Sequence, residues 1–137
     1  MFQFPKVEFD AESRALRADV RAFLAAERAA GALEPAADCW VSAASPEFSR
    51  KMGARGWLGM TWPKEYGGLG WEPEQFLVFE EELGRAGAPP LINFGINLAG
   101  PVIFTFGNDD QKKKYLNNIA RNNTWWCQGY SEPGAGS

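Results

Sequence analysis

The sequence has no histidine and only two cysteines among its 137 residues, and these absences narrow its chemistry. Without an imidazole the chain cannot build a Ser-His-Asp or Cys-His catalytic group, and it lacks the commonest metal ligand. Cys39 and Cys127 do not form a disulfide framework, and they do not have the spacing of a metal site. We therefore expect no metal site, so any catalysis must use carboxylates, hydroxyls, backbone groups or a cofactor.

Long apolar runs and blocks of one charge are also missing. No stretch of about 18 apolar residues is present, so we expect no membrane span. The net charge is −3, and the one basic run, 112–114, follows two aspartates as the solvated side of a helix would, so we expect no nucleic-acid partner. Residues 1–16 lack the pattern of a signal peptide and are too acidic for a transit peptide. These features favour a soluble, cytoplasmic protein.

Apolar residues recur at helical spacing through most of the chain. Asp10 is a candidate cap for a helix that Gly31 would end, and Glu27 interrupts its apolar face. That face would consist of Leu16, Val20, Phe23, Leu24 and Ala30. Ser45 followed by Pro46 predicts a second, short helix that closes at a glycine of residues 53–56.

The middle of the chain alternates a loop with further helices. Residues 57–71 contain three tryptophans and many glycines, so we expect a loop that packs against the protein. A helix over 74–86 would place Phe76, Phe79 and Leu83 on one face, which Leu77 and Val78 would widen. Its glutamates at 80–82 are interpreted as solvated, or as paired with Arg85 at helical spacing.

The apolar stretch 91–107 predicts a buried helix with a break at Gly100-Pro101, and a pair of core strands is the alternative. Asn108 then caps a helix over 109–123, which would turn inward the side chains of Tyr115, Leu116 and Ile119. Residues 124–131 are rich in aromatic side chains and predict a strand, with one of its two tryptophans facing the helices.

These elements predict an all-α fold of about five or six helices with one terminal strand. A lone strand leaves its backbone groups without partners, so it requires a sheet to follow. We therefore expect the chain to be the first part of a longer protein. Residues 1–123 would form an N-terminal helical domain, and residues 124–137 would begin a β-domain that the chain lacks.

The turn "SEPGAGS" at 131–137 is the strongest candidate for a ligand site. Gly134 and Gly136 allow a ligand to approach the backbone closely, and successive N–H groups in such a turn can bind phosphate oxygens. The turn is neither a Walker loop nor a dinucleotide-binding glycine motif. An ordinary connection, with the Ser131 hydroxyl bonded to its own backbone, is the alternative.

Four stretches resemble motifs of the acyl-CoA dehydrogenase family, in the same order. Residues 130–137 resemble its flavin-binding signature, in which Ser or Thr precedes Glu-Pro-Gly-Ala-Gly-Ser. The other three are a Pro-x-x-Tyr-Gly-Gly-x-Gly loop at 62–70, a Glu-Glu-Leu helix at 80–86 and a Gly-x-x-x-Gln-Lys helix at 106–116. Residues 1–61 agree with the family only in being helical.

The resemblance implies an FAD site. Ser131 would hydrogen-bond the N5/O4 edge of the flavin, and the backbone at Gln128 and Tyr130 would meet its pyrimidine side, where donors stabilise the reduced flavin. Tyr130 as a plain core aromatic is the alternative. The backbone from Gly134 to Gly136 would lie along the pyrophosphate.

The substrate of the family is an acyl-CoA thioester. By resemblance, the Ser137 hydroxyl would reach the pyrophosphate or the CoA thioester. The helix over 96–106 would form a wall of the acyl pocket, and Leu98 would contact the acyl chain unless it serves only helix packing. The family oxidises the acyl group to a trans-2-enoyl-CoA in lipid and fatty-acid metabolism, with a glutamate base in its C-terminal helical bundle. Nothing in this chain corresponds to that base, and Glu132 belongs to the turn, so we expect no catalytic residue here and no activity of the chain alone.

The resemblance also implies an electron-transfer flavoprotein as acceptor and a homo- or hetero-oligomer as the full-length form. Two alternatives to an FAD-dependent acyl-CoA dehydrogenase remain. One is an oxidase or flavin monooxygenase of the same superfamily, in which the reduced flavin meets oxygen. The other is a non-catalytic helical interaction module whose glycine turn is structural.

Overall fold

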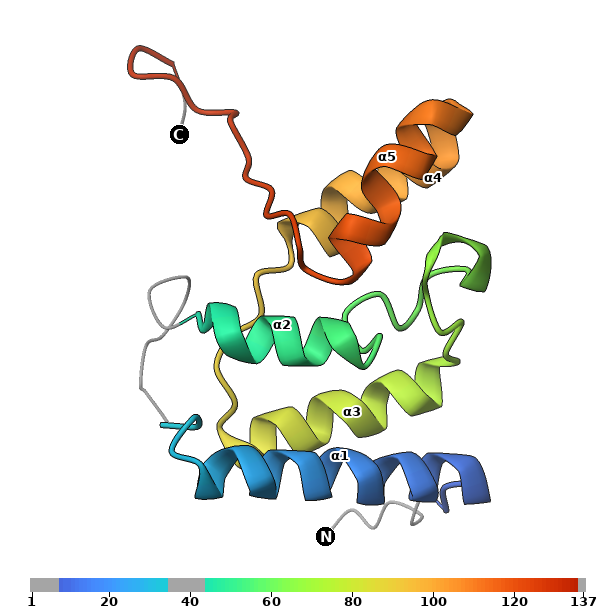
Figure 1. The fold of residues 1–137 in the computed structure, drawn as a ribbon, viewed down its shortest axis with the longest axis vertical. Helices are drawn as coiled ribbons and strands as arrows, with labels where there is room; N and C mark the ends of the chain where they lie inside the picture. Colours follow the sequence, from blue (N-terminus) through green and yellow to red (C-terminus); the bar gives the residue numbers. More distant parts are fainter. Residues whose placement is uncertain (1–7, 35–43, 136–137) are drawn as a thin grey trace, which may run out of the picture. The chain divides into compact units, whose positions relative to one another are not determined.

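The computed structural model describes residues 8–34 and 44–135, so Cys39, Gly136 and Ser137 lie outside the described residues. Five α-helices form there: α1 (Ala11–Ala29), α2 (Pro46–Ala54), α3 (Pro73–Ala86), α4 (Gly100–Phe106) and α5 (Asp109–Ala120) (Figure 1). A 3-10 turn, η2 (Lys64–Tyr66), and a π-helix, η3 (Gly95–Ala99), complete the helical segments. The all-α prediction is confirmed.

The sequence led us to expect no membrane span and no metal site, and the described residues 8–34 and 44–135 can be searched for both. None of the helices described is long and apolar enough to cross a membrane. No group of three acidic, cysteine or histidine side chains within these ranges could hold a metal ion.

The chain divides into two compact units, one made of Met1–Ala37 and Trp71–Pro89 and the other of Asp38–Gly70 and Pro90–Ser137.

The first unit consists of α1 and α3, which run parallel. At their starts, the backbone N–H of Asp10 donates to the Glu74 carboxylate, with 3.2 Å between N and Oε1. At their ends, the Arg28 guanidinium donates to the carbonyl of Ala86. Asp10 caps α1 as predicted, since its Oδ1 accepts from the backbone N–H of Ser13 at 2.6 Å, and these hydrogen bonds lower the pKa of the Asp10 carboxyl.

The core of this unit comes from the predicted faces, with two corrections. Its buried apolar side chains are Val20, Leu24, Leu33, Val78, Phe79 and Leu83. Phe76 and Leu77, which we expected on that face, are 40% and 51% exposed, whereas Val78 is buried as expected. Glu27, which we expected to reduce burial in the last turns of α1, is itself buried.

Glu82 is a partial correction, because we expected it to be solvated or paired with Arg85, and it is paired but not solvated. Its side chain is only 2% exposed and receives hydrogen bonds from two arginines of α1. Arg21 donates through Nε and an NH2 group at 2.9 and 2.7 Å, and Arg17 donates at 3.2 Å. Arg85 also forms an ion pair with Glu82, as one of the two alternatives predicted, with 3.8 Å between Nε and Oε1. A carboxylate can be buried here because partners distant in sequence pair with it.

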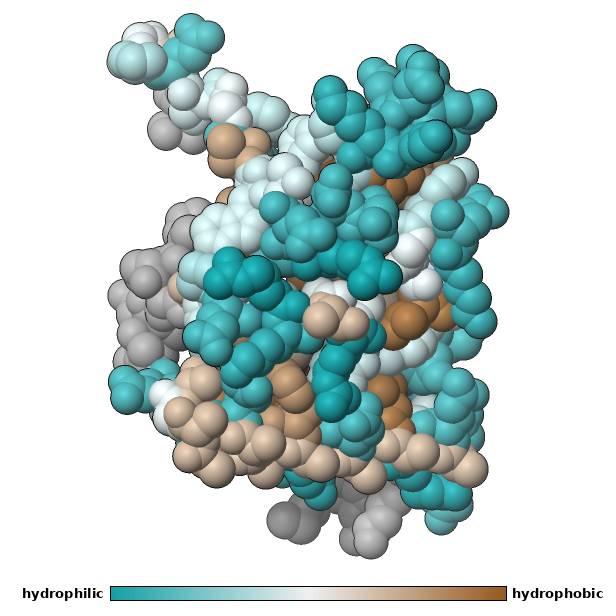
Figure 2. Space-filling model, in the orientation of Figure 1, coloured by the Kyte–Doolittle hydropathy of each residue, from teal (hydrophilic) through white to brown (hydrophobic). Residues whose placement is uncertain are grey.

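The second unit contains α2, η3, α4 and α5. Ser45 caps α2 as predicted, by accepting a hydrogen bond from the backbone N–H of Phe48 at 3.2 Å. Phe48 and Met52 of α2 are fully buried, and α5 contributes Leu116 and Ile119 to the core. The outer face of α5 is hydrophilic (Figure 2), in agreement with the prediction of a solvated lysine run.

The tryptophan-rich loop packs, as predicted from its composition. Trp57, Leu58, Met60 and Trp62 are all buried. The loop folds back on itself after η2, where the N–H of Gly70 donates to the carbonyl of Trp62 at 3.0 Å. The two tryptophans thus contribute to the core of the second unit even though no long helix holds them.

Residues 94–106 of the apolar stretch are helical, so the alternative of two core strands is wrong. The predicted break at Gly100-Pro101 is present as the boundary between η3 and α4. The tightest contact at this boundary is at Gly100, where an added Cβ would lie 2.0 Å from Cζ2 of the Trp62 indole. Glycine is therefore required for the helix to pass the tryptophan at this distance.

The predicted strand at 124–131 does not form among the described residues. Residues 125–130 follow an extended path (Figure 1) but bond to no neighbouring strand, and the turn contains only a single bridge between Glu132 and Ala135. Strand assignment requires a ladder of backbone hydrogen bonds, and the described chain offers no partner for one. The local pattern predicted the extended backbone but not its pairing.

Candidate functional site

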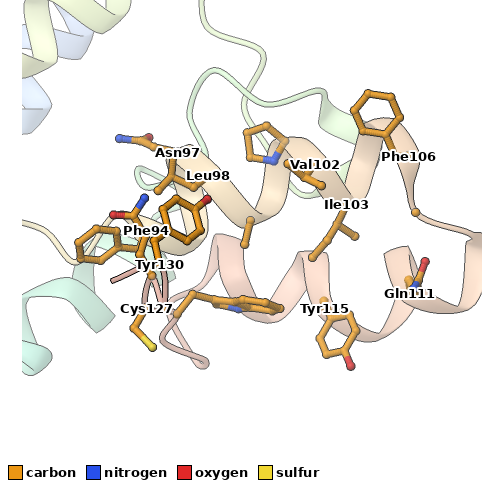
Figure 3. A pocket seen from close by; sticks show the side chains of 16 residues that line it. Phe94, Asn97, Leu98, Val102, Ile103, Phe106, Gln111, Tyr115, Cys127 and Tyr130 are labelled. Carbon is orange, nitrogen blue, oxygen red and sulfur yellow. The ribbon is translucent and has the colours of Figure 1, made fainter. Parts of the chain in front are cut away.

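An apolar groove of about 750 Å³ lies in the second unit, between η3–α4, α5 and the extended residues 126–130 (Figure 3). The helical wall includes the side chains of Phe94, Leu98, Val102, Ile103 and Phe106. From α5 come Gln111 and Tyr115, and from the extended segment Trp126, Cys127, Gln128 and Tyr130. The groove has the size of an ordinary small-molecule site and is mostly apolar.

The helical wall of the groove faces outward. Leu98 is 42% exposed, Val102 58% and Phe106 82%, although all three side chains are apolar. Three such residues on one helical stretch form a continuous apolar surface, which in soluble proteins marks a binding site. Covering that surface with an apolar group would gain about 25 cal/mol for each Å² removed from water.

The opposite wall is made of two aromatic side chains that contact each other. Tyr115 of α5 and Trp126 meet edge to face, with 5.7 Å between their ring centroids. Trp126 is half-buried while Trp125 is 47% exposed, which agrees with the prediction that one of the pair faces the helices. The buried Nε1 of Trp126 has no hydrogen-bond partner among the residues described.

Gln111 is the main polar side chain at the α5 end of the groove, and its position follows from the cap of that helix. Its Oε1 accepts from the backbone N–H of Asn108, and Oδ1 of Asn108 accepts from the N–H of Gln111, both at 2.9 Å. This reciprocal pair satisfies two of the free donors at the helix start. The Gln of the Gly-x-x-x-Gln-Lys stretch is therefore explained by capping.

The structure brings together three of the residues predicted from sequence. Leu98, Gln128 and Tyr130 all line the groove. Ser131 and Gly134 are exposed in the following turn and do not line it, and Gly136 and Ser137 lie outside the described residues. The resemblance implied that the helix over 96–106 forms a wall of the acyl pocket, but it singled out Leu98 and did not name Val102, Phe106 or Trp126. The four-residue spacing from Leu98 to Val102 to Phe106 was the signal that could have identified the first two.

Residues 128–134 leave backbone N–H donors available, and these donors fit the edge and phosphates of a flavin. The turn is closed by two hydrogen bonds of its own, from the N–H of Glu132 to the Ala135 carbonyl at 2.8 Å and back at 3.1 Å. The N–H groups of Gln128, Tyr130 and Ser131 bond to no described residue. The space beside Gly134 is open, since an added Cβ would meet nothing within 4 Å. Exposed donors next to open space suit a flat ligand with carbonyl and phosphate oxygens.

Comparison with known proteins gives a consistent family. The sequence model of the acyl-CoA dehydrogenase N-terminal domain matches residues 10–123. The chain is 35% identical to the acyl-CoA dehydrogenase FadE26 of Mycobacterium tuberculosis over 96% of its own length and 34% of that protein. It is 42% identical to the acyl-CoA dehydrogenase IpdE1 of the same organism, over 66% of this chain and 24% of that one.

Solved structures agree with the sequence matches. A crystal structure of the ChsE4-ChsE5 complex from Mycobacterium tuberculosis superposes with a TM-score of 0.71 at 34% identity, covering 96% of this chain and 33% of that chain. The Tcur3481-Tcur3483 steroid ACAD gives a TM-score of 0.69 at 32% identity over 96% of this chain and 34% of that chain. The chain thus spans about a third of the length of these relatives. By its motifs, its helices and these matches, the chain belongs to the acyl-CoA dehydrogenase family, as its N-terminal domain.

Proposed function

We propose that this chain supplies the N-terminal helical part of an FAD-dependent acyl-CoA dehydrogenase. The observation that carries the proposal is the apolar groove, one end of which is formed by the backbone that presents free N–H donors. Leu98 belongs to the apolar wall, and Gln128 and Tyr130 belong to the donor edge. An acyl chain and the edge of a flavin require these two kinds of surface side by side.

Bound FAD would accept the β-hydride when the acyl-CoA thioester is oxidised to a trans-2-enoyl-CoA. In this chain, the N–H groups of Gln128, Tyr130 and Ser131 would hold the flavin edge. The backbone from Gly134 to Gly136 would lie along the pyrophosphate, and Ser137 would reach the pyrophosphate or the thioester. Hydrogen-bond donors at these positions stabilise the negative charge of a reduced flavin.

The α-proton of the thioester must be removed by a carboxylate, which the proposal places outside this chain. Glu132 is exposed, and its backbone is committed to the turn. Residues 1–123 would be the N-terminal helical domain, and 124–137 would enter a β-domain supplied by the rest of a longer protein. In that arrangement, residues 124–130 would find the strand partner that the described residues do not provide. The chain alone would be inactive.

The acyl group is the part of the substrate that this groove would bind. A straight chain along Leu98 and Val102 is the first candidate. The Tcur3481-Tcur3483 structure is of a steroid ACAD, and the groove is wide enough at about 750 Å³ that a fused-ring acyl group is the second candidate. Both would bury the exposed apolar side chains of the helical wall.

The proposal includes a setting for the complete enzyme. Its acceptor would be an electron-transfer flavoprotein, and its location the cytoplasm. It would be a homo- or hetero-oligomer, which the ChsE4-ChsE5 complex supports by analogy. An oxidase or flavin monooxygenase would share this groove and differ in the fate of the reduced flavin. A non-catalytic helical module would bind no flavin.

Cofactor binding tests the proposal in the complete protein. We expect a yellow protein, or one that FAD makes yellow on reconstitution. Ser131→Ala should weaken FAD binding about 2- to 10-fold, the value of one neutral hydrogen bond. Thr124→Ala removes another exposed hydroxyl of the same segment outside the groove and should leave FAD affinity unchanged. A colourless protein that FAD cannot reconstitute would show the proposal to be wrong.

A further inference from the structure

The boundary between η3 and α4 leaves the carbonyl of Ile96 without a helical donor. The N–H of Gly100 bonds to the carbonyl of Gly95, five residues back, in the π-helical pattern. The next residue in this pattern is Pro101, which has no N–H and cannot bond to the carbonyl of Ile96. Ile96 is buried, so its carbonyl needs a partner other than the helix and water.

Trp62 supplies that partner from the tryptophan-rich loop. Its Nε1 donates to the carbonyl of Ile96 at 3.1 Å, and its side chain is only 3% exposed. The same indole fills the space over Gly100, where even a methyl group would overlap its ring. One side chain therefore satisfies the carbonyl that the π-helix leaves free and covers the glycine that ends the π-helix.

The indole is itself held from two sides. Phe104 of α4 meets it edge to face with 5.5 Å between centroids, and Tyr66 of η2 stacks on Phe104 at 5.5 Å with 5° between the ring planes. On the backbone side, the Trp62 carbonyl accepts from Gly70, and an added Cβ at Gly68 would lie 2.1 Å from that carbonyl. Trp62 thus has little freedom to move without moving α4.

The π-helix matters because it sets which side chains face the groove. Phe94, Leu98, Val102 and Phe106 recur every four residues, and all line the groove. In an α-helix, four residues turn by about 40° more than a full circle, so a line of side chains spaced by four residues drifts steadily around the helix. A π-helix holds more residues per turn, and the four steps through η3 offset part of that drift. The hydrogen bond that stabilises η3 therefore acts on the position of Leu98.

We infer that Trp62 is a positioning residue for the acyl group: by bonding to the Ile96 carbonyl, it maintains the π-helix that sets the position of Leu98 on the groove wall. Trp62 does not line the groove and touches no reacting atom. Its loss would let η3 relax towards an α-helix and rotate Leu98 relative to Val102. This inference rests on the proposed function, because it concerns the fit of the acyl group to that groove.

The test compares Trp62→Phe with Trp57→Phe in the complete flavoenzyme. The side chain of Trp57 is 4% exposed, against 3% for Trp62, and it does not line the groove. Trp57→Phe is therefore a matched control for the loss of an indole. Gly100→Ala is a second variant at the same contact, which displaces the indole without removing its N–H. The substrates are straight-chain acyl-CoAs from short to long and one acyl-CoA with a fused-ring acyl group.

We expect Trp62→Phe and Gly100→Ala to change the ratio of kcat/KM between long and short substrates by about 10-fold, the size of a typical apolar-pocket discrimination. The change should lie in KM, with kcat for the best substrate within about 3-fold of wild type, because binding and not chemistry is altered. Trp57→Phe should leave the ratio unchanged.

An unchanged ratio in both variants, with acyl-CoA turnover intact, would overturn the positioning role and leave Trp62 as a core residue. A ratio that Trp57→Phe alters equally would overturn it too, because general loosening would then explain the effect. If the wild-type flavoenzyme neither binds nor oxidises any acyl-CoA, the proposed function itself fails. The two failures are therefore distinguishable by the wild-type enzyme alone.

Discussion

Glu82→Gln is the substitution that tests the first unit most sharply. The Glu82 carboxylate is almost fully buried and accepts three hydrogen bonds from Arg17 and Arg21, the closest at 2.7 Å. Removing one partner of a buried ion pair costs about 3–5 kcal/mol. Glutamine keeps the shape of the side chain and one acceptor oxygen. Arg21 is 58% exposed, so water can solvate its guanidinium when the carboxylate is lost. We therefore expect a smaller loss in the free energy of unfolding, about 2–3 kcal/mol.

Urea denaturation followed by circular dichroism measures this loss, and Glu81→Gln is the matched control. Glu81 precedes Glu82 on the same helix and pairs with the same Arg17 at 2.7 Å, but its side chain is 42% exposed. An exposed pair contributes below about 1 kcal/mol, so Glu81→Gln should change stability little. Equal effects of the two variants would refute the reasoning, because burial would then not decide the value of the carboxylate.

The same carboxylate predicts a pH dependence with a definite sign. Hydrogen bonding to Arg21, and then the positive charges of Arg21, Arg17 and Arg85, hold the pKa of Glu82 below its ordinary value of 4.5, against the opposing effect of burial. A group whose folded pKa is lowered stabilises the fold above its unfolded pKa and loses that contribution as the pH falls through its folded pKa. Stability should therefore fall below about pH 4.5, and Glu82→Gln should show a flatter acid limb of the stability curve.

Three further substitutions, two of them paired with a control variant, test other parts of the molecule. Gly100→Ala should lower the free energy of unfolding by about 1–3 kcal/mol in thermal denaturation, because its methyl group overlaps the Trp62 indole. Gly84→Ala, which meets nothing within 4 Å, should instead stabilise α3 by about 0.5–1 kcal/mol, and the same sign for both would contradict the packing at Gly100. Asn108→Ala should cost about 1 kcal/mol through loss of the α5 cap, whereas Asn118→Ala within the helix should not destabilise; equal losses in urea melts would argue against a capping role. Leu98→Asp should lower acyl-CoA affinity about 10-fold in calorimetry, with stability changed by less than about 0.5 kcal/mol, and unaltered affinity would remove Leu98 from the acyl site.

Features that depend on nearby residues were predictable from the sequence. Asp10, Ser45 and Asn108 cap helices because their side chains reach a backbone N–H three residues ahead, which the pattern itself contains. The break at Gly100-Pro101 follows equally from the local chemistry of proline. Leu98, Gln128 and Tyr130, chosen from a family resemblance, do line one groove.

Features that depend on distant partners were not predictable. Glu82 can be buried because Arg17 and Arg21 donate hydrogen bonds to it. These arginines lie 65 and 61 residues away in sequence, and no helical pattern shows that pairing. The π-helix is stabilised by Trp62, which is 34 residues from Ile96. The prediction of a strand at 124–131 was wrong because a strand also depends on a distant partner. The local pattern was present, but the described residues offer no strand to pair with it.

The central claim is that this chain forms part of a flavin site for acyl-CoA oxidation. Anaerobic titration of the FAD-loaded complete protein with an acyl-CoA tests it most directly, with flavin absorbance and enoyl-CoA formation followed together. The account predicts that the flavin absorbance falls as acyl-CoA is added and that about one enoyl-CoA forms for each flavin. An absorbance that stays constant with no enoyl-CoA formed, at acyl-CoA concentrations that saturate other flavoenzymes of this family, would contradict it.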